Sequence, residues 1–457
     1  MSFQFLTLTV EAERKVKNGQ DALKICKDFK AQMKSAYEDA ASTMDGDGES
    51  FLGIVPDKIV LCGNSYKPDG AQVLAAFCTA INDTVKKLDM SDIIASQPEE
   101  QGLEVLKLIS DAFSESKLEY LRNCDNALGS KGINACMSVI GGQAKTLKHL
   151  YLENDGLAAE SLQILEQILT KPAEGESTCA CDNLETLRFH DNMSGVEGAR
   201  AAGRIFAQLK HPKELRYTDC RSLGEGSTGL ADGLDAMGDH IASLEKLNLA
   251  GNFFVTSDKE IDQSLLRALE RAKGLKHIGL RDCNLEEEGS QLVCEALMKS
   301  GAKLESIDIS ENDLGREDAL NTLVQLIVQN RATLKKLEVE GNDLSSAGVN
   351  KIMKALGKIN SVIETINFKT NMVGRIGAKA VLNCTMSNLQ LLQLDDNGFF
   401  PEEVKALKTK FADKLEEMVD NMEDDDVDED EGIEEDEDGD DDGDVAALAE
   451  GISKVGV

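Results

Sequence analysis

Residues 147–157 of this chain read LKHLYLENDGL, and this stretch decides the architecture. Leu150 and Leu152 alternate with Tyr151, as expected of a short strand whose successive side chains point to opposite faces. The same spacing of apolar residues returns about every 29 residues, for example at residues 244–252 and 304–312. A repeat of this length indicates a stack of similar strand-and-helix units, each of which buries its apolar face against its neighbours.

The ninth position of each phrase ends the predicted strand and carries an amide in most repeats. A side-chain amide at this point can bond the main-chain groups of neighbouring turns, which would otherwise be buried without partners. We therefore expect a ladder of such residues along the stack. Its predicted members are Asn126, Asp155, Asn192, Asn252, Asn312, Asn342, Asn371 and Asn397, with Cys220 and Cys283 at the same position in two repeats.

A helical stretch follows the phrases. After Asn312, the residues Leu320, Leu323, Leu326 and Ile327 form a stripe that a helix would turn toward the strands. Strand, turn and helix in a period of about 28–31 residues are typical of leucine-rich repeats of the ribonuclease-inhibitor type. We predict an α/β fold, a leucine-rich-repeat solenoid shaped as a crescent of about twelve repeats. Partners are expected on its inner face or on the loops at the strand ends.

The two ends of the chain differ from the repeats. Residues 1–50 are expected to form an N-terminal helical cap, with its helix over residues 21–43, and a flexible link. The solenoid is expected at residues 51–420. Within residues 423–444, 17 residues are acidic, against a formal net charge of −34 for the whole chain. Such a block repels itself and buries no apolar surface, so residues 421–457 are predicted to be a disordered acidic tail with a short terminal helix.

Composition and motifs narrow the class of protein. The 457 residues are 41% hydrophobic, contain no apolar run of membrane-spanning length, and begin without the pattern of a signal peptide. No basic stripe favours nucleic acid, and the eleven scattered cysteines are expected to be reduced thiols. The G-x-S-x-G, P-loop and H-E-x-x-H patterns are absent, and the five histidines are isolated among the repeats. The residues alone therefore predict a binding solenoid that is not an enzyme and holds no metal or cofactor.

Three local phrases point to a family. They are LDMSDIIASQPEE at residues 88–100, LRNCDNALG at residues 121–129 and LKHLYLENDG at residues 147–156, one in each of three successive repeats. In this order, on an array of this length with an acidic C-terminus, they resemble the Ran GTPase-activating proteins. The resemblance extends from about residue 56 into the tail, and the phrasing is nearest to that of plant-type members.

The resemblance implies a regulator of nucleocytoplasmic transport that stimulates GTP hydrolysis by the small GTPase Ran in its GTP form. Members of this family are understood to position Ran's own catalytic glutamine with a loop asparagine, without an arginine finger. The matching residue here is Asn154, and the implied GTPase-binding residues are Asp125, Asp155, Asp191 and Gln97. GTP and magnesium would belong to Ran, and a Ran-binding protein is a candidate third member of the complex. The expected location is cytoplasmic or perinuclear.

This chain departs from the family pattern at two points. The segment that matches residues 94–98 generally carries an arginine, and this chain has Gln97 there. A charge-assisted contact with the GTPase is then missing unless a neighbour such as Lys107 supplies it. Plant-type members also carry an N-terminal domain named for a Trp-Pro-Pro motif. A chain without tryptophan cannot contain that motif, so anchoring at the nuclear envelope by that route is not expected.

Two other functions stay open on the sequence. One is a scaffold or inhibitor that binds a protein on the concave face without changing the rate of any reaction. The other is a module that binds histones or other basic proteins through the acidic tail. The rate of GTP hydrolysis by Ran separates the first function from both alternatives.

Overall fold

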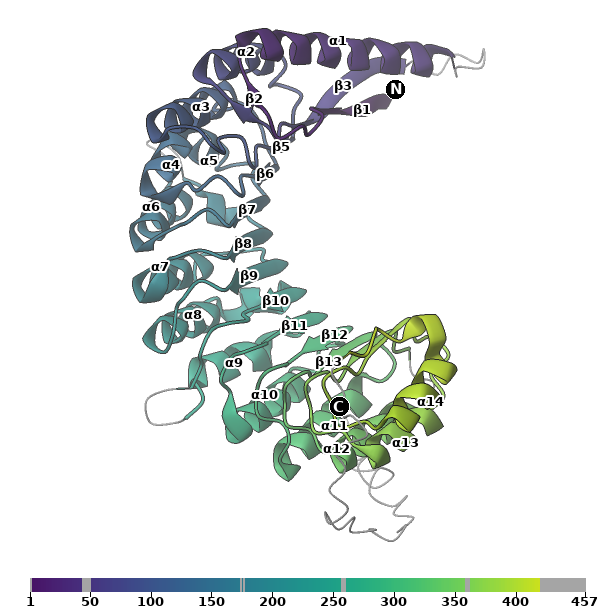
Figure 1. Ribbon diagram of the computed structural model, residues 1–457. Coiled ribbons are helices and arrows are strands. Elements are labelled where there is room, and N and C mark those ends of the chain that lie inside the picture. Colours follow the sequence, from purple (N-terminus) through teal and green to yellow (C-terminus); the bar gives the residue numbers. More distant parts are fainter. Residues whose placement is uncertain are drawn as a thin grey trace. The chain divides into compact units, whose positions relative to one another are not determined.

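A computed structural model describes residues 2–42, 51–172, 175, 177–255, 260–357 and 362–419. The chain divides into two compact units, Met1–His240 and Ile241–Val457, and each is described here by itself. In both units short parallel strands alternate with helices, and the helices lie on one side of the strands (Figure 1). The predicted leucine-rich-repeat architecture is therefore confirmed.

The first unit holds one parallel sheet in the order β1-β3-β5-β6-β7-β8-β9 and a small two-stranded sheet, β2-β4. Its strands are β1 (Ser2–Thr9), β2 (Val16–Lys17), β3 (Phe51–Val60), β4 (Ser65–Tyr66), β5 (Lys87–Asp89), β6 (Tyr120–Arg122), β7 (His149–Glu153), β8 (Thr186–His190) and β9 (Glu214–Thr218). Its helices are α1 (Gly19–Ser42), α2 (Pro68–Thr79), α3 (Glu99–Ala112), α4 (Gly129–Ala135), α5 (Met137–Gly141), α6 (Ala159–Thr170), α7 (Gly195–Phe206) and α8 (Glu225–Ala236).

The second unit continues the same alternation with six parallel strands in chain order. The strands are β10 (Lys246–Asn248), β11 (His277–Gly279), β12 (Ser306–Asp308), β13 (Lys336–Glu338), β14 (Thr365–Asn367) and β15 (Leu391–Gln393). The helices are α9 (Gln263–Arg271), α10 (Glu286–Ser300), α11 (Glu317–Asn330), α12 (Ser346–Gly357), α13 (Arg375–Asn383) and α14 (Pro401–Phe411). Each unit contributes six of the strands that the repeated phrase predicts, so the expected number of about twelve repeats is confirmed in the described residues.

Apolar rows that run from strand to strand make the core. Leu150 in β7 is in register with Leu121 in β6 and with Leu187 in β8, and all three side chains are fully buried. Because each row continues through the next repeat, every strand buries one face against the helices behind it.

The predicted ladder is present at the strand ends. Asn192, for example, donates from Nδ2 to the main-chain oxygen of Leu152 (3.0 Å) and accepts at Oδ1 from the main-chain nitrogens of Asp155 (3.1 Å) and Leu157 (3.0 Å). One buried amide therefore satisfies the main chain on two neighbouring turns.

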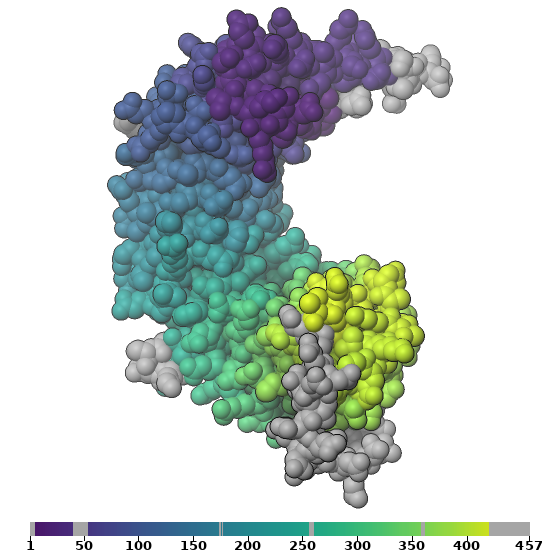
Figure 2. Space-filling view, viewed as in Figure 1, coloured from purple at the N-terminus to yellow at the C-terminus, as the bar shows by residue number. Residues whose placement is uncertain are grey.

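The N-terminal end contains an element that the sequence analysis did not anticipate. α1 forms where a helix was predicted, but Ser2–Thr9 forms strand β1, which pairs along its whole length with β3. The purple residues at the end of the first unit in Figure 2 thus belong to an additional strand and helix rather than to a helix alone. The predicted link at residues 44–50 and the predicted tail at residues 421–457 lie outside the described residues.

All eleven cysteines are free thiols, and every one except the half-buried Cys62 is buried. Across the described residues, no helix is both long and apolar enough to span a membrane.

Candidate functional site

The loops that leave the strands share one backbone feature. The eighth residue of all twelve phrases has a positive φ, between 50° and 77°. This left-handed conformation is strained for most side chains and is adopted most easily by glycine, asparagine and aspartate. The twelve residues are Gly63, Asp92, Asp125, Asn154, Asp191, Asp219, Gly251, Asp282, Glu311, Gly341, Thr370 and Asp396.

Asn154 leaves β7 at this position with an exposed side chain and a φ of 54°. Its main-chain nitrogen donates to the His190 main-chain oxygen (2.8 Å), and its Nδ2 donates to Oδ1 of Asp125 (2.9 Å). Both bonds hold the amide in one orientation. Within the described residues no hydrogen bond is made to Asn154 Oδ1, so a hydrogen-bond acceptor is presented toward solvent.

Asp125 and Asp191 lie on the strand exits on either side of Asn154. Both are exposed, and β6, β7 and β8 are in register, so the three side chains form one short row. Asp125 contacts Asn154 directly through the bond described above, whereas Asp191 has no recorded bond to it. In the first unit Asn154 is the neutral amide in a row whose other members are aspartates or glycine.

Gln97 lies in the loop between β5 and α3 and is half-buried. It lines a hollow of about 660 Å³ together with Ile94, Leu128, Asp125 and Lys131. Gln97 and Asp125 therefore share one depression beside the row. The cation in this hollow is Lys131, which pairs with Glu99, whereas Lys107 pairs with Asp111 within α3 (2.8 Å) and is not part of the lining. The expectation that Lys107 replaces the missing arginine is not supported.

The structure corrects one predicted binding residue. Asp155 is fully buried at the ninth position, where its Oδ1 accepts a hydrogen bond of 2.9 Å from the main-chain nitrogen of Asn126. A side chain without exposed surface cannot contact a partner. The prediction of Asp155 as a GTPase-binding residue is therefore wrong, and its place is that of a support beneath Asn154.

An aromatic and basic surface on the open face of the strands was missed by the sequence analysis. The rings of Tyr120 and Tyr151 lie 5.0 Å apart, those of Tyr120 and His149 lie 6.2 Å apart, and the Arg188 guanidinium lies 5.0 Å from the Tyr151 ring centre. Burial lowers the pKa of His149, which favours its neutral form, and raises the pKa of Tyr120 to about 12. Equal offsets in successive repeats are the sequence signal, since Tyr120 pairs with His149 and Tyr151 with Arg188.

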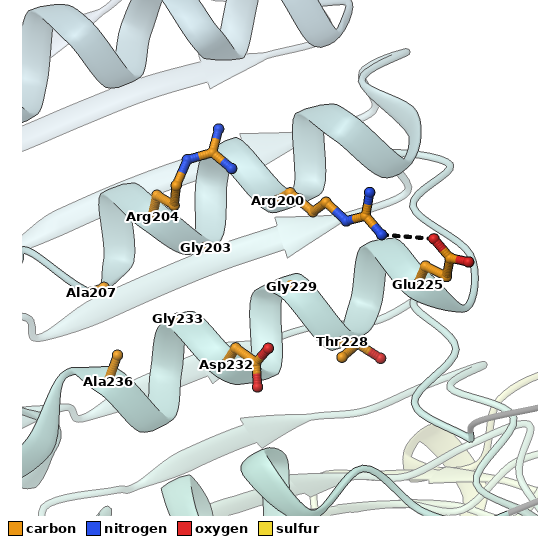
Figure 3. A pocket seen from close by; sticks show the side chains of 10 residues that line it. All are labelled: Arg200, Gly203, Arg204, Ala207, Glu225, Thr228, Gly229, Asp232, Gly233 and Ala236. Carbon is orange, nitrogen blue, oxygen red and sulfur yellow. Dashed lines mark hydrogen bonds and ion pairs between the residues drawn. The ribbon is translucent and has the colours of Figure 1, made fainter.

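A second hollow, of about 490 Å³, lies between α7 and α8 on the helical side of the first unit. In Figure 3, Arg200 reaches from α7 to Glu225 on α8 (2.7 Å), and Gly203, Gly229 and Gly233 lie along the helices. Arg204 makes two hydrogen bonds to Glu166 (2.7 and 2.8 Å). The charged groups around this hollow are thus engaged with one another. In the part of the chain that the structure describes, no group of three His, Cys, Asp or Glu residues could hold a metal ion.

Comparisons with known proteins agree with the repeat architecture and with the three phrases. No family model matches the chain. RAN GTPase-activating protein 2 of Arabidopsis thaliana is 30% identical over 358 residues, which cover 78% of this chain and 62% of that protein. RAN GTPase-activating protein 1 of the same plant is 41% identical over 95 residues, 21% of this chain and 18% of that protein. Ribonuclease inhibitor of Sus scrofa is 25% identical over 252 residues, 55% of this chain and 52% of that protein.

In each of these comparisons the match spans less than two thirds of the relative's length. The similarity to the plant proteins is nevertheless highest where the sequence phrases predicted it to be found, at the level of the family rather than of the repeat alone. The chain is a leucine-rich-repeat protein that resembles the Ran GTPase-activating proteins of plants.

Proposed function

We propose that this chain stimulates GTP hydrolysis by a Ran-type small GTPase in its GTP form, and that it does so without hydrolysing nucleotide itself. The observation that carries the proposal is the orientation of Asn154. Its Nδ2 is held by Asp125 at 2.9 Å, which leaves Oδ1 to accept a hydrogen bond from an incoming side chain. The similarity to the two Arabidopsis proteins supports the choice of reaction.

In the proposed mechanism, Asn154 Oδ1 accepts a hydrogen bond from the side-chain NH₂ of the GTPase's own glutamine. The glutamine carbonyl oxygen is then turned toward the attacking water. Hydrolysis of the γ-phosphate depends on an aligned water and on stabilised charge, and a preorganised neutral amide supplies the alignment. It supplies no positive charge, so charge stabilisation is left to the GTPase and its magnesium ion.

The proposed interface extends from Asn154 in two directions. On one side lie Asp125 and the hollow lined by Gln97, and on the other lies Asp191. Tyrosine and arginine are enriched at protein interfaces, which makes the Tyr120, Tyr151 and Arg188 surface a candidate extension of the contact. Exposed aspartates beside Asn154 favour a partner surface with basic side chains.

The remaining parts of the proposal are a Ran-binding protein as the third member of the complex, and a cytoplasmic or perinuclear location. GTP and magnesium are carried by the GTPase, and this chain is proposed to need no cofactor.

The test measures hydrolysis by GTP-loaded Ran with a substoichiometric amount of this protein. Asn154→Gly is the informative variant, because glycine tolerates the positive φ while the amide is lost. We expect the stimulated rate to fall by about 10²-fold or more, as when one preorganised donor or acceptor is removed. Thr370→Gly is the matched control, since Thr370 is an exposed eighth-position residue in the second unit and should leave stimulation unchanged.

Two results would contradict the proposal. If the Asn154→Gly protein stimulates hydrolysis as well as the wild type, Asn154 is not the aligning residue. If the wild-type protein binds Ran without changing its rate, the chain is a binding scaffold or inhibitor. The similarity to ribonuclease inhibitor keeps that second reading specific.

A further inference from the structure

The ladder obeys a donor rule. At six ninth positions, the asparagine Nδ2 donates to the main-chain oxygen of the sixth residue of the preceding repeat, at 2.8 to 3.1 Å. The six pairs are Asn126 to Met90, Asn192 to Leu152, Asn312 to Leu280, Asn342 to Ile309, Asn371 to Val339 and Asn397 to Phe368. Even Cys283 follows the rule, from Sγ to the Leu249 oxygen at 3.4 Å. A donor at this position is therefore a general requirement of the stack.

Asp155 occupies a ninth position and has no donor when ionised. Its Oδ1 accepts from Asn126, while its Oδ2 is buried and has no hydrogen-bond partner. The acceptor that the rule assigns to it is the main-chain oxygen of Asn123. No described residue donates to that oxygen, because the Asn126 amide turns instead to the Asn123 side chain, with Nδ2 to Oδ1 at 2.7 Å. Two acceptors are thus left without a proton at one rung of the ladder.

We propose that Asp155 is a neutral carboxylic acid whose Oδ2–H donates to the main-chain carbonyl of Asn123, completing the ladder beneath Asn154. A single proton satisfies both orphan acceptors, and a protonated carboxyl then copies the asparagine amide of the other repeats. The inverse arrangement, an ionised Asp155, would bury a negative charge directly against a carbonyl oxygen.

The surrounding charges favour the neutral form. Burial raises the pKa of Asp155 well above its usual range, and the carboxylates of Asp125 and Glu153 raise it further. The Asn126 N–H and the Arg122 guanidinium act in the opposite direction. Two thiols also face this rung, and burial raises the pKa of Cys124 to about 12 and that of Cys136 to about 11, so both stay uncharged at neutral pH.

The proton has a consequence for the proposed function, on which this one step rests. Asp155 follows Asn154 in the chain, and its main-chain nitrogen is held by Asn192 Oδ1 at 3.1 Å. Loss of the proton would loosen the rung that holds the Asn154 loop. Asp155 is therefore a positioning residue, and stimulation of the GTPase should decrease as pH rises through the pKa of Asp155.

The protonation itself is tested without any GTPase. An acid whose folded pKa is raised makes the folded state less stable as pH rises from about 4 toward that folded pKa, because only the folded state keeps the proton. Asp155→Asn supplies a donor that does not titrate. In denaturant unfolding of the full chain, the folding equilibrium constant of the wild type should fall by up to about tenfold per pH unit relative to Asp155→Asn. Asp396→Asn, an exposed carboxylate on an equivalent loop, should leave the wild-type slope unchanged.

Two further measurements complete the test. Infrared difference spectra of wild type and Asp155→Asn at neutral pH should contain one protonated-carboxyl C=O band that the variant lacks. The ratio of Ran hydrolysis with and without this protein should fall with rising pH for the wild type and stay level for Asp155→Asn. Parallel pH slopes in unfolding, or absence of the infrared band, would overturn the protonation. If both are observed but the hydrolysis ratio shows no difference, the positioning role is wrong while the neutral acid stands.

Discussion

A single residue position links the stability of this fold to its proposed chemistry. The eighth residue of every phrase must adopt a positive φ, and the side chains that tolerate this best are glycine, aspartate and asparagine. Of these three, asparagine alone is neutral and offers both a donor and an acceptor. Asn154 thus satisfies a backbone requirement shared by all repeats and adds a function that its acidic neighbours cannot. This double role explains why the sequence pattern alone could not separate a structural asparagine from a functional one.

Substitutions at Asn154 should separate the two roles. Asn154→Ala should lower the free energy of unfolding by about 1–2 kcal/mol, because alanine is strained in the left-handed region. Asn154→Gly should leave it nearly unchanged, since glycine carries no such strain. Denaturant unfolding of the two variants and the wild type measures the difference. Equal stability of the alanine and glycine variants would show that the positive φ relaxes at little cost.

A ladder residue should behave in the opposite way. Asn312 donates to the main-chain oxygens of Leu280, Ile309 and Ser310 and accepts from the main-chain nitrogen of Leu285 (2.8 to 3.1 Å). Asn312→Leu leaves these groups without partners and should cost about 1–3 kcal/mol for each that stays buried and unpaired. The denaturation midpoint should fall, while stimulation of Ran measured well below that midpoint should be normal. An unchanged midpoint would mean that water or a neighbouring group replaces the amide.

Between elements, the closest packing in the first unit is that of α7 against α8. A Cβ added at Gly203 would overlap the main-chain oxygen of Gly229, and one at Gly233 would overlap the oxygen of Gly203. Side chains at these points would force the helices apart, so the glycines set the distance between two neighbouring repeats.

Gly203→Ala should therefore destabilise the protein by about 1–3 kcal/mol through overpacking, although alanine is the better helix former by about 1 kcal/mol. Gly141→Ala is the control, because its added Cβ would meet only Ile168 at an ordinary distance of 3.6 Å. Unfolding midpoints of the two variants provide the measurement. If Gly203→Ala is as stable as Gly141→Ala, the contact between α7 and α8 adjusts without cost.

The elements also show what periodicity could and could not predict. The phrase strands β3 and β5 to β15 follow from the recurring spacing, because each repeat imposes the same inward positions on the chain. β1 was missed because SFQFLTLT has the alternation of a strand but none of the repeat phrase around it. Asp155 was misassigned because it follows Asn154 directly, and only the three-dimensional register shows that one side chain is exposed and the next is buried.

For the whole molecule, the distribution of charge has consequences that no single residue carries. Residues 423–457 hold half of the formal net charge of −34. The last recorded contact before this segment joins the main-chain nitrogen of Val419 to Asp395 Oδ1 (2.6 Å). Removing residues 423–457 therefore eliminates no contact of the described residues, and it reduces the self-repulsion of the chain.

Deletion of residues 423–457 should leave the unfolding midpoint of the repeats unchanged or slightly raised, and should change the salt dependence of association with Ran. Exposed charges are screened beyond about 10 Å at 0.1 M ionic strength, so attraction between an acidic chain and a basic GTPase surface acts mainly on the association rate. We expect the full-length protein to associate faster than the truncated one at low salt, and the two rates to converge at high salt. Stopped-flow association at several salt concentrations, with the truncated protein as the control, measures both slopes. Identical slopes would assign the steering to the acidic residues of the repeats, such as Asp125 and Asp191, whereas a lowered unfolding midpoint would show that the deleted segment packs on the array.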